Sequence, residues 1–378
     1  MMMLVAREKQ FVIRGYKGVK MQIRRVMLKN VRNFASFDQS FQDPWTDRVP
    51  DALLLIGPNG SGKTTLIEVI AGLWQLFGEM LQDPASPPNL IVGPWQEFSQ
   101  RDVFMAMEVI GLEQKSIWIA AGQKNKFDSF VASTIGSHRI YLVWPSQNEK
   151  PAFTRYISPS QTAYQDDLED SLWLNQWQKR ITENRLGKRM DLPNIVCLPS
   201  ETRTLFQVQE PGPAQPEPKA FQWIRRYSPT ERRKGSIENY LFNLRVLDDG
   251  RYEKIVNQIN QFLIGKRLDG FDERTMELMV ATERGTKHPM HLLSSGEKQV
   301  LLMLAFITRW LEPGGVVLID EPDLHLHVSL AKAFTSHLRR MVAQKNGQLI
   351  IASHEPALWE QFTQSQRIEL GLVTEVQR

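Results

Sequence analysis

The stretch GPNGSGKT, from Gly57 to Thr64, combines residue types and a spacing that bind the phosphates of a nucleotide. It fulfils the pattern G-x-x-x-x-G-K-[ST] between an apolar run and an amphipathic segment, the strand–loop–helix context that this pattern needs. Its glycines allow backbone N–H groups to approach phosphate oxygens at the start of a helix. The lysine contacts the β- and γ-phosphates, and the threonine hydroxyl binds Mg²⁺. The stretch therefore predicts ATP and Mg²⁺ as cofactors, with nucleotide contacts from Gly57, Asn59, Gly60, Ser61, Gly62, Lys63, Thr64 and Thr65.

Two carboxylates end a second apolar run, in GVVLIDEPD. Val316 to Ile319 are continuously apolar, as expected of a strand buried on both faces. Asp320 and Glu321 follow at the carboxyl end of this strand, which is where open α/β sheets bind their ligands. We expect Asp320, with Thr64, to hold Mg²⁺ and Glu321 to polarise the attacking water. The alternative is a polar pair that caps the next helix.

A third apolar run, in QLIIASHEP, ends in a histidine. Its strand follows the strand that ends in Asp320, so His354 is expected at the same edge of the sheet. There it would contact the γ-phosphate or orient the water, and we assign it a catalytic role beside Glu321. The alternative is a loop histidine with ordinary hydrogen-bond partners.

The segment LSSGEKQ opens a long apolar helix and offers a second anion site at the helix N-terminus. One ATP already has a complete cradle in residues 57–64, so a second anion site is redundant unless it faces another nucleotide. In a two-fold dimer it would face the γ-phosphate bound by the partner subunit. Ser294 would then donate its hydroxyl, and Gly296 would permit close backbone approach. The pattern predicts an ATP-dependent homodimer.

Alternation of apolar strands and amphipathic helices at both ends of the chain predicts an α/β fold with a parallel sheet. We expect an N-terminal extension at 1–20, a lobe with the phosphate loop at 21–144, a helical and polar insertion at 145–290, and a C-terminal lobe at 291–378. Residues 1–20 are either an added strand or the product of translation from an upstream start. The second alternative is suggested by Met21, which directly precedes a segment suited to be the first strand of the domain.

Composition limits the classes of protein that the chain can belong to. Of its 378 residues, 42% are hydrophobic and 23% are charged, as in ordinary globular proteins. The net charge of +4 permits a nucleic-acid partner without requiring one. A single cysteine, Cys197, excludes an intramolecular disulfide framework. No apolar run reaches membrane-spanning length, so we expect a cytoplasmic protein with no membrane partner.

The phosphate loop, LSSGEKQ, VVLIDEPD and IIASHEP, in this order, resemble the ABC-type P-loop ATPases. The resemblance implies an ATPase head whose sheet is flanked by helices and which hydrolyses ATP to ADP and phosphate. It implies that Ser294 is the signature serine, Glu321 the catalytic base and His354 the switch histidine. The segment LKNVRNF resembles the first strand of SMC- and RecF-like heads, which would bring Arg32 and Asn33 near the nucleotide.

Details of the motifs resemble the RecF, OLD and PtuA-like ATPases of DNA repair and phage defence more than transporters. The signature reads Ser-Ser-Gly-Glu-Lys-Gln, and DEPDLHLH would place His325 and His327 near a dimer interface. Neither a Toprim nuclease domain nor a long coiled coil is expected, so the resemblance implies a separate effector, a nuclease or a toxin. Two alternatives remain: the nucleotide-binding subunit of a transporter, and a structural protein that barely hydrolyses ATP.

Two basic clusters and one acidic run fall in the expected insertion. RRYSPTERRKG contains Arg225, Arg226, Arg232, Arg233 and Lys234, with Trp223 and Tyr227 interleaved, and QKRITENRLGKR is similarly basic. Both clusters could contact the backbone of DNA or RNA. The alternative is that they form a solvated face or a face that contacts another protein. The acidic run QDDLED, at 165–170, is predicted to be a solvated helix face. We therefore expect no nucleic-acid cleavage by this protein alone.

Overall fold

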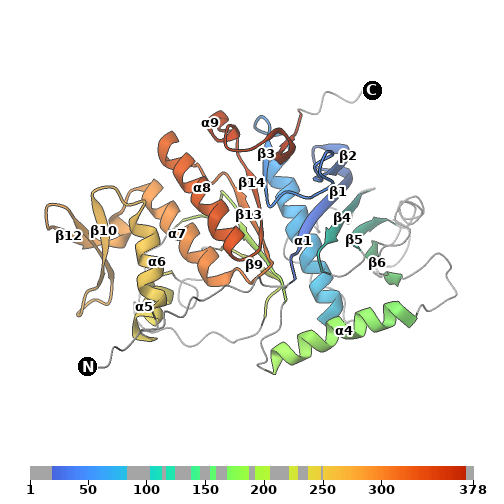
Figure 1. Ribbon diagram of the computed structural model, residues 1–378, viewed down its shortest axis with the longest axis horizontal. Helices are drawn as coiled ribbons and strands as arrows, with labels where there is room; N and C mark the ends of the chain where they lie inside the picture. The colour runs from blue at the N-terminus through green and yellow to red at the C-terminus, as the bar shows by residue number, and fades with distance from the viewer. Residues whose placement is uncertain are drawn as a thin grey trace, which may run out of the picture.

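The computed structural model describes residues 19–82, 103–112, 116–123, 138–144, 154–158, 168–186, 192–204, 221–228, 237–247 and 250–371. These residues form two six-stranded sheets and one three-stranded sheet, with helices between and around them (Figure 1). None of the helices in the described ranges has the length and apolar character that crossing a bilayer requires.

The central sheet has the strand order β15-β3-β14-β13-β8-β9, and each pair of neighbours is parallel. Four inner strands are buried along their whole length, which explains their continuous apolar runs. Parallel strands end at one common edge, so the polar residues after them are brought together. The predicted α/β fold is confirmed. The strands are β3 (Ala52–Ile56), β8 (Ile195–Leu198), β9 (Ile224–Arg226), β13 (Val316–Asp320), β14 (Gln348–Ala352) and β15 (Arg367–Glu369).

Helix α1 (Lys63–Gln82) lies between the central sheet and the second six-stranded sheet (Figure 1). Its side chains share one core with alternate residues of β3 and β13 on one side and with β1 and β4 on the other. This double contact explains why most of the helix is buried. The second sheet has the order β2-β1-β4-β5-β6-β7, with β1 (Gln22–Val31), β2 (Phe34–Ser40), β4 (Phe104–Ile110), β5 (Ile117–Gln123), β6 (His138–Trp144) and β7 (Thr154–Ser158).

Helices α7 (Ser295–Trp310) and α8 (Val328–Gln344) cover the other face of the central sheet. Their buried side chains pack on the residues of β3, β13 and β14 that point away from α1. Helices α5 (Ile237–Leu247) and α6 (Arg251–Asn260) pack on α7, and a three-stranded sheet follows them at one end of the molecule. That sheet contains β10 (Lys266–Phe271), β11 (Leu278–Thr282) and β12 (Lys287–Pro289). Short turns at η2 (Met290–Leu292), α9 (Pro356–Trp359) and η3 (Gln364–Gln366) complete the described elements.

The segment predicted as an insertion, 145–290, contributes two strands to the central sheet. Strand β8 pairs with β13, and β9 pairs with β8, both in parallel. The short run IVCL is fully buried, so it belongs to the core, although its neighbours are polar. Helix α4 (Leu168–Arg185) from the same segment packs on α1. The predicted domain boundaries stay a prediction, and β8 lies within the sheet that carries the phosphate loop.

An aromatic cluster joins β9, α1 and α4. Trp223 is 5% exposed and lies 5.7 Å from Trp74 and 5.6 Å from Phe77 between ring centroids. Trp177 lies 5.8 Å from Phe77. A Cβ atom at Gly78 would stand 2.1 Å from the Trp223 ring, so only glycine lets this ring reach the helix. Trp223 is therefore a core residue and offers no face to a nucleic-acid base.

Replacing Trp223 by alanine should lower the free energy of unfolding by about 3–5 kcal/mol, because it leaves a cavity among packed rings. Denaturant unfolding followed by circular dichroism measures this change. Trp45→Ala is the matched control: Trp45 is 93% exposed, and its removal should change stability by no more than about 0.5 kcal/mol. Equal effects of the two variants would contradict the core assignment.

Candidate nucleotide-binding site

The phosphate loop connects the end of β3 to the start of α1. Gly60 and Gly62 have φ angles of 79° and 100°, which side chains rarely adopt. A Cβ atom at Gly62 would also stand 2.4 Å from the ring of Phe34, at the start of β2. Glycine is required at this position both for the backbone turn and for the contact with the second sheet.

Lys63 turns back over the loop. Its Nζ donates hydrogen bonds to the carbonyl oxygens of Gly57, at 2.7 Å, and Pro58, at 2.9 Å. Burial lowers the pKa of Lys63, and the carboxylates of Glu321 and Asp320 oppose that shift. The ammonium is thus held inside the loop, facing the carboxylates at the end of β13.

Asp320 is joined to the phosphate loop and to the segment after β8 through one of its oxygens. Oδ2 accepts hydrogen bonds from Thr64 Oγ1, at 2.7 Å, and from Ser200 Oγ, at 3.1 Å. The side chain is 1% exposed, and Oδ1 has no hydrogen-bond partner among the described residues. A buried carboxylate oxygen without a partner is costly unless a cation binds it. With two hydroxyl oxygens beside it, this donor set suits Mg²⁺, which prefers oxygen ligands.

Glu321 and His354 lie together at the same edge of the sheet. His354 Nδ1 is 3.2 Å from Glu321 Oε1, and the Glu321 N–H donates to the carbonyl of Ala352 at 2.8 Å. Glu321 has a φ of 50°, an uncommon value for a residue with a side chain. The side chains of Glu321 and His354 are 24% and 48% exposed, so both can reach a water molecule. The structure brings this predicted pair together because β13 and β14 are parallel neighbours.

Asn33 and Arg32 fasten the turn between β1 and β2 to the phosphate loop. Asn33 Nδ2 donates a short hydrogen bond to the carbonyl of Gly60. Arg32 donates to Glu68 Oε2 at 2.8 Å and to Thr65 Oγ1 at 3.4 Å. Asn33 and Thr65 therefore lie beside the loop. Of the other predicted loop residues, Asn59 is exposed, and Ser61 is 1% exposed with an Oγ that has no partner among the described residues.

Ser294 and Gly296 stand at the start of α7. Ser294 caps the helix: its Oγ accepts from the Glu297 N–H at 3.4 Å and donates to Glu297 Oε2 at 2.8 Å. Lys266 holds both oxygens of Glu297 at 3.0 Å. Burial raises the pKa of Glu297, but bonds from Ser294 and Lys266 outweigh this and leave the pKa lowered. Among the described residues, no hydrogen bond joins Ser294 to the phosphate loop of its own chain.

Gly296 packs against the loop that follows β13. A Cβ atom at Gly296 would stand 2.6 Å from the carbonyl oxygen of His325. His325 itself has a φ of 66°, and His327 caps α8 by accepting a bond from the Ser329 N–H. The predicted place of these histidines at a dimer interface stays a prediction.

Three residues at the site were not predicted from the sequence: Ser200, Arg203 and Gln299. Ser200 and Arg203 follow β8, in the segment NIVCLPSETR. Arg203 donates to the backbone of Asp320 and Glu321, and Gln299 of α7 donates to the Arg203 carbonyl at 2.6 Å. The signal available in the sequence was a polar segment directly after a short apolar run.

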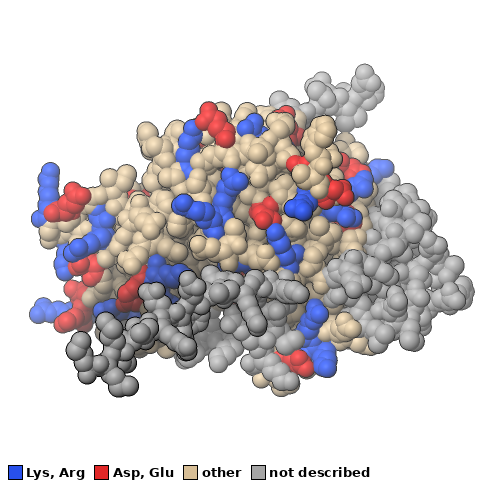
Figure 2. Space-filling view, viewed as in Figure 1, with Lys and Arg blue, Asp and Glu red and all other residues tan. Residues whose placement is uncertain are grey.

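The basic cluster RRYSPTERRKG is engaged within the molecule where it is described. Arg226 pairs with Glu68 at 3.2 Å, Arg225 stacks 3.5 Å above the Trp310 ring, and the Tyr227 hydroxyl donates to the Thr204 carbonyl. Arg232, Arg233 and Lys234 lie outside the described residues, as do Asp166 and Asp167 of the acidic run. On the face drawn in Figure 2, the described Lys and Arg side chains are interspersed with Asp and Glu. Nucleic-acid binding stays a prediction.

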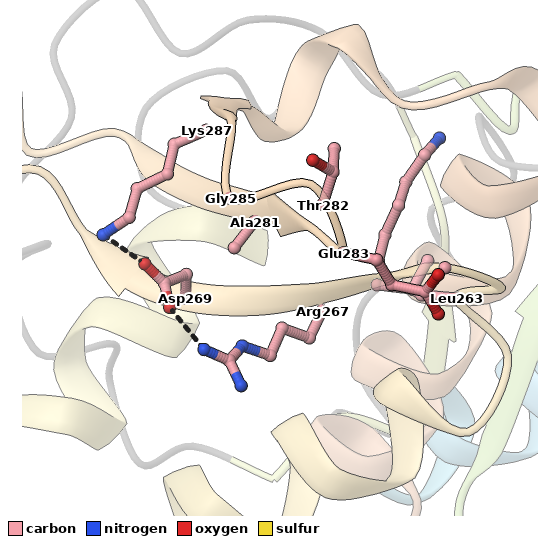
Figure 3. Close-up of a pocket in the computed structure, with 10 residues that line it drawn as sticks. Leu263, Arg267, Asp269, Ala281, Thr282, Glu283, Gly285 and Lys287 are labelled. Atoms are coloured by element: carbon pink, nitrogen blue, oxygen red, sulfur yellow. Dashed lines mark ion pairs between the residues drawn. The ribbon is translucent and has the colours of Figure 1, made fainter.

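A separate cavity of about 500 Å³ lies on the three-stranded sheet, and none of its lining residues belongs to the phosphate loop. Among its lining residues, the Asp269 carboxylate lies between two cationic side chains (Figure 3). Its oxygens are 2.5 Å from the Lys287 ammonium and 3.8 Å from the Arg267 guanidinium. Ala281 also lines this cavity. The described residues contain no group of three or more His, Cys, Asp or Glu side chains placed to hold a metal ion, either here or elsewhere.

Comparison with known proteins agrees with this geometry. Residues 256–360 match the family model described as "AAA domain, putative AbiEii toxin, Type IV TA system". Residues 256–360 therefore belong to a domain of the ABC-type P-loop ATPases. The family match covers α7, β13, α8 and β14 and therefore includes LSSGEKQ, Asp320, Glu321 and His354. The predicted membership of this group is confirmed, and nucleotide binding follows from the family.

Other similarities are narrower or weaker. Protein ea59 of Escherichia phage lambda is 34% identical over 73 residues, which are 19% of this chain and 14% of that protein. The SMC head domain from Thermotoga maritima aligns with a TM-score of 0.40 at 14% identity, covering 90% of this chain and 91% of that one. The Smc head domain of Pyrococcus furiosus, bound to the C-terminal domain of ScpA, gives 0.42 at 11% identity, with 90% and 91% coverage.

Replacing Lys63 by alanine should weaken ATP binding by about 100-fold or more, because truncating one partner of a hydrogen-bonded charge pair costs ~2–5 kcal/mol. The variant should stay folded, since no other side chain depends on Lys63 in the bonds described above. Titration with a fluorescent ATP analogue measures the affinity. Lys29→Ala, at an exposed position on β1, is the control, and its affinity should equal that of the wild type. Unchanged binding by Lys63→Ala would refute the phosphate-loop assignment.

Proposed function

We propose that this protein binds ATP with Mg²⁺, hydrolyses it to ADP and phosphate, and thereby closes and opens a homodimer that controls a separate effector. The observation that carries the proposal is the convergence of Lys63, Thr64, Asp320, Glu321 and His354 at one edge of the central sheet. These side chains come from the start of α1, which follows β3, and from the ends of β13 and β14. They supply a cation, a metal-binding pair and a carboxylate with a histidine.

Each residue has one task in the proposed hydrolysis. Lys63 and the loop N–H groups bind the phosphates, and Thr64 and Asp320 hold Mg²⁺, which when bound neutralises charge on the phosphates. Glu321 accepts a proton from water as the water oxygen bonds to the γ-phosphorus and the bond to the ADP oxygen breaks. His354 orients Glu321 through the contact at 3.2 Å. The exposure of Glu321 and His354 leaves room for the water between them and the phosphate.

The dimer is proposed from the position of the second anion site. The α7 N-terminus presents exposed Ser294 and the positive end of the helix dipole. Among the described residues, the Ser294 hydroxyl donates only to Glu297. A γ-phosphate bound by the partner subunit would replace Glu297 as the acceptor of the Ser294 hydroxyl. ATP then joins two subunits, and hydrolysis removes the group that joins them.

A role in phage defence or DNA repair is proposed from the family and from the details of the motifs. The family description names an AbiEii toxin and a type IV toxin–antitoxin system. By this analogy the closed dimer would hold or release a protein partner, a nuclease or a toxin, in the cytoplasm. DNA or RNA contact through the basic clusters would supply the trigger.

Replacing Glu321 by glutamine should retain ATP binding and reduce turnover by about 100-fold or more, as expected for loss of a general base. The variant should accumulate as an ATP-bound dimer, visible by light scattering with and without ATP. Glu312→Gln, an exposed position before the opposite end of β13, should hydrolyse ATP like the wild type. Full hydrolysis by Glu321→Gln would remove this residue from the mechanism.

Mixing two inactive variants tests whether Ser294 acts on the partner's nucleotide. Ser294→Arg should block turnover and leave the ATP affinity of the isolated subunit nearly unchanged. An equimolar mixture with Lys63→Ala should recover about a quarter of the wild-type rate, since about half of randomly assorted dimers are mixed and each has one intact site. A thermal unfolding scan of Ser294→Arg accounts for the lost helix cap, worth about 1 kcal/mol. No recovery at any mixing ratio would reject the shared site.

A further inference from the structure

Arg203 is a buried arginine whose guanidinium contacts the backbone of the two carboxylates at the end of β13. It is 2% exposed. Nη1 donates to the carbonyl oxygen of Asp320 and, at 3.4 Å, to that of Leu198, and Nη2 donates to the carbonyl of Glu321 at 2.6 Å. One side chain from the loop after β8 therefore holds two successive peptide groups at the end of β13.

Burying this cation is costly. Desolvation lowers the pKa of Arg203 to about 10, while the carboxylates of Asp320, Glu321 and Asp323 oppose the shift. Nε has no partner among the described residues. A packing residue would not need a charge here, because an apolar side chain fills such a space without a desolvation penalty. The Arg203 guanidinium instead donates hydrogen bonds to the backbone carbonyls of Asp320 and Glu321, which an apolar side chain could not do.

The backbone of Glu321 needs such support. Its φ of 50° is strained for a residue with a side chain and persists only if the surroundings fix it. The Glu321 N–H is fixed by the carbonyl of Ala352, and its carbonyl is fixed by Arg203. Together these two bonds determine the direction in which the Glu321 side chain leaves the backbone.

Arg203 is also joined to the helix that begins at the signature segment. Gln299 of α7, 8% exposed, donates from Nε2 to the Arg203 carbonyl at 2.6 Å. Ser294, the N-cap of the same helix, is about one and a half turns away, so Ser294 and Gln299 move together as parts of a rigid helix. A displacement of α7 would therefore move the main chain at Arg203, and with it the guanidinium that holds Glu321.

We propose that Arg203 is a positioning residue that holds Glu321 in its working conformation and transmits the position of α7 to it. The inference rests on the proposed hydrolysis and adds a route by which the partner's nucleotide, engaged at Ser294, adjusts the base of the same chain. A shift of α7 away from this position would move Arg203 and misdirect Glu321.

The first test separates positioning from folding. Arg203→Ala should bind a fluorescent ATP analogue within about threefold of the wild type and lose about 100-fold in kcat with little change in KM, as expected when a catalytic group is misplaced. Guanidinium at millimolar concentration should raise the kcat of Arg203→Ala at least about tenfold, because it refills the space of the missing side chain. Urea, which carries no charge, should not. Arg203→Lys should stay impaired, because an ammonium cannot span both carbonyls.

The second test measures the connection to α7. Gln299→Leu should lower kcat, and its effect should nearly disappear in the Arg203→Ala background, because both changes interrupt one pathway. Gln344→Leu, at an exposed position in the last turn of α8, is the matched control and should have no effect in either background. Additive effects of Gln299→Leu and Arg203→Ala on kcat would reject the transmission.

Hydrogen exchange gives a readout that does not require turnover. In Arg203→Ala, the amides of Glu321, Asp323 and Leu324 should exchange faster than in the wild type, and in Lys63→Ala they should not. If the wild type hydrolyses no ATP, the proposed function fails, and exchange alone decides whether Arg203 fixes this backbone. If the wild type hydrolyses ATP and Arg203→Ala shows normal kcat and normal exchange while folded, the Arg203 proposal is overturned.

Discussion

The hydrogen bond between Thr64 Oγ1 and Asp320 Oδ2 is the interaction on which the site depends, because it joins segments 256 residues apart in the chain. It connects the start of α1 to the end of β13 across the position where β14 ends. The other oxygen of Asp320 is buried without a hydrogen-bond partner among the described residues. A carboxylate in this position is stable only near positive charge, and Lys63 supplies part of it. A bound divalent cation would complete the arrangement.

The layered fold provides the rigidity that this contact requires. Helix α1 is packed between two sheets, so the phosphate loop at its start has little freedom to move. From the second sheet, Phe34 packs on Gly62, and Asn33 bonds to Gly60. From the other face, α7 reaches the same edge through Gln299 and Arg203. The second sheet and α7 therefore meet at the edge that carries the candidate site from opposite sides.

Polar residues that looked available for external partners are used inside the molecule. Arg226 shares Glu68 with Arg32, and Arg225 lies on Trp310. Charge and aromatic composition indicate nucleic-acid binding only when the side chains face solvent, and here Trp223 faces the core. The opposite holds for the short segment after β8. It has no charged run and no motif, yet Ser200 and Arg203 contact the residues on which catalysis would depend.

The order and spacing of residues along the chain were enough to predict those structural features that neighbouring residues form by themselves. The phosphate loop and the apolar strand before Asp320 each involve residues a few positions apart. The folded arrangement was needed to show that β8 lies beside β13 and that Arg203 holds Glu321. Strand neighbours in a parallel sheet are set by long connections and by burial on both faces, which local patterns do not encode. The site residues that the sequence indicates belong to motifs, and those that it misses reach the site only through the strand order.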